Sequence, residues 1–140
     1  MTLRLREGPT GFELPVQNRE SLLGQPLSSP QVRLTPNEVD SMQAHDSAAR
    51  TSGVSGIRTT VVAGDPTQAG PYTIRLSTPA NTKIQAHPHR DNRTAIVISG
   101  VWYFGYSPIA GEEEDKALPA GSFYTAPGGV AHFAKRRWIP

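Results

Sequence analysis

Three of the four histidines in this 140-residue chain stand in two short segments rich in glycine and proline. His87 and His89 are separated by one residue, and His132 follows Pro127 and Gly129. Neutral imidazole is a common protein ligand for zinc, iron, copper and nickel. Two imidazoles at i and i+2 on a strand project from the same face, and a third from a distant strand can complete a facial set. The pattern predicts a site for one divalent ion (Fe, Zn, Mn or Ni) made by His87, His89 and His132.

The elements expected to carry these histidines are β-strands. From Ile57 onward, short β-branched and aromatic segments alternate with Gly, Pro, Asn and Asp clusters, which is typical of an all-β sandwich or barrel. Residues 1–32 show no sustained period and predict a flexible, irregular N-terminal arm. A capping pattern predicts a short helix from Pro36 to about His45. The expected strands cover residues 57–63, 71–77, 82–89, 94–99, 101–106, 122–126 and 130–134.

The two histidine segments resemble the paired motifs of the cupin family. Cupins have a first motif with His-x-His, Glu and Gly, and a second with Gly, Pro-x-Gly, His and Asn. The residues that match in order and spacing are His87, His89 and Gly100 for the first motif, and Gly121, Pro127, Gly129 and His132 for the second. The resemblance is to the small single-domain bacterial cupins. It implies an antiparallel jelly-roll β-barrel over residues 33–140 with a metal site inside.

Three positions depart from the family pattern. Asn81 replaces the leading Gly, Arg93 the Glu ligand, and Arg136 the closing Asn. Asn tolerates the left-handed backbone region best among non-glycine residues, so the turn at Asn81 is expected to persist. Arg93 cannot coordinate a cation because its guanidinium stays protonated. The site is then either a neutral three-histidine set with open positions, as in some cupin dioxygenases, or a degenerate site that binds metal weakly.

Arg93 itself has two interpretations. It can pair with Asp91 or a neighbouring Glu at the surface, or it can clamp an anionic substrate, because its planar fork suits a carboxylate. Asp91 would add a carboxylate ligand only if the strand continued past His89, whereas the surrounding residues are typical of a turn.

Three further side chains are candidates for substrate binding. Gln85 is expected to share the strand face of His87. Tyr103 and Tyr124 are aromatic rings that can stack on a planar ligand, with core packing as the alternative. Trp102, Phe104 and Tyr106 share one face of their expected strand and Tyr103 takes the other.

Composition narrows the classes of partner. The chain has no cysteine, which excludes disulfides and thiolate zinc sites, and its formal charge of +2 comes with no long basic run. Nucleic acid is therefore not an expected partner. The N-terminus carries Arg and Glu where a signal peptide needs an apolar stretch, and no apolar run is long enough to span a membrane. We expect a soluble, cytoplasmic, single-domain protein.

The end of the chain raises a question about assembly. It stops eight residues after His132, whereas small cupins continue with at least one more strand. The resemblance therefore implies a missing C-terminal strand. Either the uncovered sheet edge is covered by the N-terminal arm or by a second subunit in a homodimer, or the chain is truncated relative to the family and not fully functional.

The leading functional hypothesis is a metal-binding cupin that takes a small anionic or oxygen-rich ligand. If it is an enzyme, the resemblance favours a metal-dependent dioxygenase. The alternatives are a non-catalytic regulatory module of the zinc-binding cupin type and a metal-free barrel with a structural role. Exchangeable iron favours the enzyme, and tightly held zinc favours the module.

Overall fold

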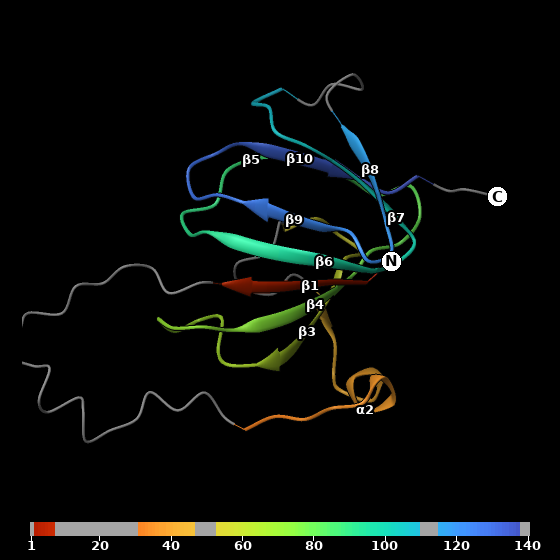
Figure 1. The fold of residues 1–140 in the computed structure, drawn as a ribbon, viewed down its shortest axis with the longest axis vertical. Helices are drawn as coiled ribbons and strands as arrows, with labels where there is room; N and C mark the ends of the chain where they lie inside the picture. Colours follow the sequence, from red (N-terminus) through yellow and green to blue (C-terminus); the bar gives the residue numbers. More distant parts are fainter. Residues whose placement is uncertain (1, 8–30, 47–52, 110–114, 138–140) are drawn as a thin grey trace, which may run out of the picture.

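The computed structural model describes residues 2–7, 31–46, 53–109 and 115–137. In these residues the chain is mostly antiparallel β-structure, with the short helix α2 (Pro36–Asp40). Thr35 and Glu38 form a capping box that satisfies backbone donors at the start of α2. The strands form two sheets that lie as two layers (Figure 1). No helix in this part of the chain is long and apolar enough to cross a membrane.

The larger sheet has six strands in the order β2-β3-β4-β1-β6-β9. Strand β6 shows the two-residue period of a half-buried strand, because Arg93, Ala95 and Val97 are buried whereas Ile96 and Ile98 are exposed. Arg93 therefore points to the interior side of this sheet. The strand bounds are β2 His45–Asp46, β3 Arg58–Ala63, β4 Thr73–Ser77, β1 Thr2–Glu7, β6 Arg93–Ser99 and β9 Phe123–Ala126.

The smaller sheet has four strands in the order β5-β10-β7-β8. Their bounds are β5 Lys83–His87, β10 His132–Lys135, β7 Val101–Gly105 and β8 Lys116–Pro119. The register of β10 against β5 places His132 directly opposite His87. Directly opposed residues of antiparallel strands have neighbouring side chains, so the sheet itself brings these two imidazoles together.

The hydrophobic core lies between the two sheets. Ile74 and Val97 of the larger sheet and Trp102 of the smaller sheet are at most 2% exposed and belong to one cluster. The predicted all-β class is confirmed. The predicted closed barrel is wrong for the described residues, because the two sheets are hydrogen-bonded separately and do not join. The jelly-roll connectivity stays a prediction.

The strands expected from the sequence agree with the structure at seven places. Strands β3, β4, β5, β6, β7, β9 and β10 each begin and end within two residues of the prediction. The short strands β2 and β8 were not predicted, and α2 ends at Asp40 rather than near His45. Asn81 adopts a φ of 61°, which confirms the left-handed conformation expected of it, and Gly100 has a φ of 74°.

The N-terminus differs from the prediction. Residues Thr2–Glu7 form β1, which is hydrogen-bonded to β4 on one side and to β6 on the other (Figure 1). These residues are therefore part of the larger sheet and not an irregular arm, and they do not cover a sheet edge. The remainder of the expected arm, residues 8–30, lies outside the described residues.

Candidate metal centre

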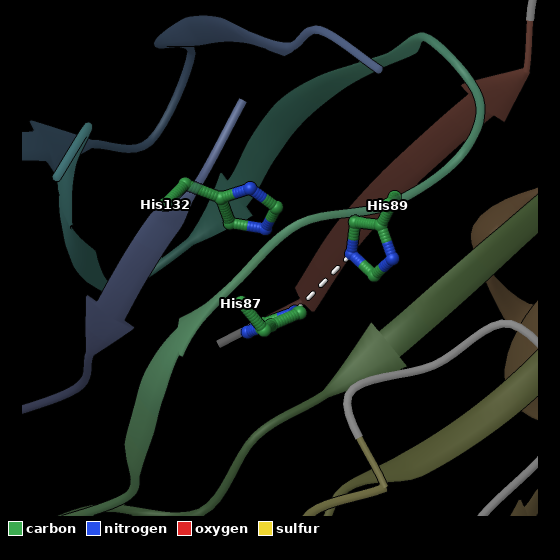
Figure 2. A group of neighbouring side chains, drawn as sticks. All are labelled: His87, His89 and His132. Atoms are coloured by element: carbon green, nitrogen blue, oxygen red, sulfur yellow. Dashed lines mark hydrogen bonds between the residues drawn. The ribbon is translucent and has the colours of Figure 1, made fainter. Parts of the chain in front are cut away.

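The three predicted ligands lie together at one end of the smaller sheet. His87 is the last residue of β5, His132 is the first residue of β10, and His89 lies two residues beyond β5. Figure 2 shows the three rings turned toward a common centre. One ring nitrogen from each lies within 4.8 Å of the others, and His87 Nε2 lies 3.2 Å from His89 Nε2. This spacing can hold a single metal ion.

Backbone carbonyls orient two of the imidazoles. His87 Nδ1 lies 2.7 Å from the carbonyl oxygen of Gln85, and His132 Nδ1 lies 3.4 Å from that of Val130. A carbonyl oxygen only accepts, so in each neutral ring Nδ1 carries the proton and Nε2 carries the lone pair. Metal-binding histidines are commonly fixed in this way by a hydrogen bond at the other ring nitrogen.

The loop that carries His89 is docked on the turn before His132. The amide of Gly129 donates to the carbonyl oxygen of His89 at 2.7 Å, and the amide of Gly128 donates to Asn92 Oδ1 at 2.8 Å. A Cβ on Gly128 would meet the carbonyl oxygen of Arg90 at 2.7 Å, so this close approach requires glycine. The turn at residues 127–129 therefore positions two ligands, His89 as well as His132.

Arg93 and Asp91 form a buried ion pair beside His89. Arg93 Nε lies 3.0 Å from Asp91 Oδ2 and Nη2 lies 3.3 Å from Oδ1, with side chains 4% and 7% exposed. Arg93 Nη1 also donates to His89 Nε2 at 3.2 Å. The expected pairing with Asp91 is therefore present, but in the interior and not at the surface. Asp91 is bound to Arg93, and the metal-compatible group found in the described residues contains the histidines alone.

Two of the histidines are held in the neutral form that a metal ligand needs. Burial, together with a smaller effect of the positive charge of Arg93, lowers the pKa of His89 to about 3. Burial also lowers the pKa of His132 to about 4, with a smaller effect of His87 in the same direction. Near neutral pH both imidazoles therefore offer a lone pair without first losing a proton.

We expect the metal-free protein to lose stability as the pH falls below about 6.5. In the unfolded chain His89 and His132 take up protons at the ordinary pKa of 6.5, whereas in the fold they do so only near 3 and 4. Within that window the unfolded state binds more protons, so the free energy of unfolding falls with pH. The stabilisation that comes from the two neutral imidazoles is fully present above the ordinary histidine pKa of 6.5.

Urea unfolding between about pH 7.5 and 4.5 measures the effect. The matched comparison is the double variant His89→Asn/His132→Asn, which keeps every carboxylate and removes both imidazoles. Wild type is expected to lose stability more steeply than the variant. If the free energy of unfolding changes with pH in the same way in wild type and in the variant, the assignment of buried neutral imidazoles is wrong.

The structure separates the predicted substrate-binding residues into two groups. The side chain of Gln85 is exposed, and only its backbone carbonyl reaches the site, through His87. Tyr103 lies on the face of β7 opposite the buried Phe104, and the Arg137 guanidinium lies 5.1 Å from its ring centre. Neither side chain is brought to the histidines.

Tyr124 and Arg93, in contrast, lie at the interior site. The ring of Tyr124 packs 4.3 Å from that of Phe104, and burial raises the pKa of its phenol well above the ordinary range. Phe104 in turn stacks on His132 at 5.3 Å between ring centres. Phe104 was not among the predicted ligand-contacting residues. The sequence did contain one indication: Phe104 and Tyr103 are adjacent on one expected strand, so their side chains point to opposite faces and one of the two rings had to face the interior.

Comparison with known proteins adds no relative. The chain matches no protein-family model, and no curated protein is similar enough to count as a match. The function of the chain is therefore inferred from the geometry of the three histidines and their neighbours.

Proposed function

We propose that His87, His89 and His132 bind one divalent metal ion, and that this centre takes a small anionic or oxygen-rich ligand. The observation that supports this most is the pair of Nε2 atoms of His87 and His89, 3.2 Å apart. Two imidazole nitrogens bound to one ion at about 2.1 Å are separated by roughly 3.0–3.4 Å, depending on the bond angle. The rings are thus spaced as metal ligands are.

The protonation of the two rings strengthens the proposal. His87 carries its proton on Nδ1, which donates to Gln85, and His89 Nε2 accepts from Arg93. In the neutral rings neither Nε2 carries a proton, so the two nitrogens lie 3.2 Å apart with no hydrogen between them, a close approach that a cation bound to both would stabilise. A proton in that place makes an imidazolium close to the Arg93 guanidinium, which like-charge repulsion disfavours. A metal ion held by all three histidines satisfies both lone pairs and gains a third ligand.

We further infer that the chain is a cupin with a dioxygenase-like centre. The inference is supported by the spacing of the two motifs and by two packed antiparallel sheets with the ligands at one end of the smaller sheet. Iron with three neutral imidazoles would supply Lewis-acid and redox chemistry at open positions. Arg93 places a positive charge beside His89 that would attract an anion, and Phe104 packs between Tyr124 and His132.

Metal analysis of tag-free protein tests the proposal. Protein exposed to iron, zinc, manganese or nickel and then desalted is expected to retain about one equivalent of metal per chain. For the iron-loaded form, electron paramagnetic resonance with added nitric oxide reports whether a coordination position is open. Tightly held zinc without an open position would identify the non-catalytic module instead. If the protein retains no metal after all four exposures, the proposal is wrong.

A further inference from the structure

The Arg93 guanidinium and a metal ion would share one lone pair. Arg93 Nη1 donates to His89 Nε2 at 3.2 Å, and the same nitrogen lies 3.2 Å from His87 Nε2. One sp² nitrogen has one lone pair in the ring plane, so it cannot satisfy the guanidinium and the metal together. Metal binding at His89 must displace this hydrogen bond.

The surroundings of Arg93 keep the guanidinium near the site after that displacement. Its Nε and Nη2 atoms are held by the two oxygens of Asp91, and both side chains are almost fully buried. Moving the cation to solvent would take this ion-pair partner away from a buried carboxylate, which is unfavourable. The guanidinium therefore stays beside His89 when the metal arrives.

Metal binding then adds positive charge to the described part of the site. Three neutral imidazoles contribute no charge and the charges of Arg93 and Asp91 cancel each other, so a divalent ion brings two positive charges into a largely buried place. The like charge of the guanidinium lies one hydrogen bond from a metal ligand. Like charges so close in an interior of low polarity repel strongly, and an anion placed between them relieves the repulsion on both sides.

We propose that the centre binds its metal together with a small carboxylate anion, and that Arg93 Nη1 is the second anchor of that anion. One carboxylate oxygen contacts the metal, and the other accepts the hydrogen bond that His89 gave up. Planar carboxylates suit a guanidinium donor, and charge-assisted hydrogen bonds are the stronger kind. Arg93 is then a positioning residue that makes the two ligands depend on each other. The inference depends on the proposed metal site.

Mutual dependence has a thermodynamic consequence. If the anion raises the affinity for the metal by some factor, the metal raises the affinity for the anion by the same factor. Without an anion, the hydrogen bond from Arg93 to His89 holds the site in a form that opposes the metal.

Titration with Co²⁺ tests this, with the free metal set by a chelator buffer and the visible spectrum used to follow coordination. Measurements in sodium acetate and in sodium perchlorate, at equal ionic strength, compare a coordinating carboxylate with a weakly coordinating anion. Wild type is expected to bind Co²⁺ about tenfold more tightly in acetate, within the usual range of coupling between sites. In the double variant Asp91→Asn/Arg93→Gln, which removes the ion pair without leaving either charge alone, the affinity in perchlorate is expected to rise and the acetate effect to shrink.

Arg90→Gln is the control, because Arg90 is an exposed arginine one residue before Asp91 and its replacement removes a nearby positive charge without breaking the buried ion pair. It should keep the acetate effect. Equal Co²⁺ affinity of wild type in the two salts would overturn the coupling and leave the metal site intact. An undiminished acetate effect in the double variant would overturn the role of Arg93. Absence of Co²⁺ binding in either salt would overturn the proposed metal site itself.

Discussion

Replacing His132 with alanine is expected to abolish stoichiometric metal binding. His132 supplies the ligand from β10 and faces His87 across the strand pair, so its loss leaves two ligands that come from one short segment. Loss of a hydrogen-bond partner of a metal ligand already lowers affinity by about 10–100-fold, and loss of the ligand itself is expected to exceed that. Metal content after desalting, determined by elemental analysis, measures the effect.

His45→Ala is the matched control, because it removes the fourth histidine of the chain, which is exposed on β2 in the larger sheet. This variant should retain the wild-type metal content. His132 also packs on Phe104, so circular dichroism of the metal-free variant is needed to show that it still folds. Equal metal content in wild type and in folded His132→Ala would contradict the assignment of His132 as a ligand.

The strands were predictable where a short β-branched or apolar run follows turn residues. Residues 93–99 show both, since a turn precedes them and residues 94–98 are β-branched or apolar without interruption. Strand β1 instead alternates Leu with Arg in Thr2–Glu7, but a six-residue segment in a proline-rich region is accepted as a strand only once its partners are known. Strand β8 follows an acidic run and ends in Pro119, which fits its place at the edge of the smaller sheet.

The candidate site was predictable to the extent that it depends on spacing. The two motifs contain the three histidines that the structure brings together, because strand register and a tight turn position them. The placement of Arg93 depends on tertiary packing: the alternation of β6 points its side chain inward only because Ala95 and Val97 face the core. For the same reason sequence alternation separated Tyr103 from Phe104 but did not show which of them faces the histidines.

Asp91→Ala is expected to lower the free energy of unfolding of the metal-free protein by about 3–5 kcal/mol, the usual cost of breaking a buried ion pair by removing one partner. The variant leaves the Arg93 guanidinium beside His89 with less compensation in a place that is 4% exposed. The same repulsion acts on any metal bound at His89, so metal affinity is expected to fall as well. Urea unfolding and metal titration of one preparation measure both effects.

Asp40→Ala provides the comparison, because Asp40 also pairs with an arginine, Arg75, but is 66% exposed. An exposed ion pair contributes about 0–1 kcal/mol, so this variant should unfold almost as wild type does. The difference between the two variants isolates burial as the cause. If Asp91→Ala costs no more than Asp40→Ala, the guanidinium of Arg93 reaches solvent once its partner is gone. In that case it does not remain beside His89, and the coupling of metal and anion through Arg93 loses its physical basis.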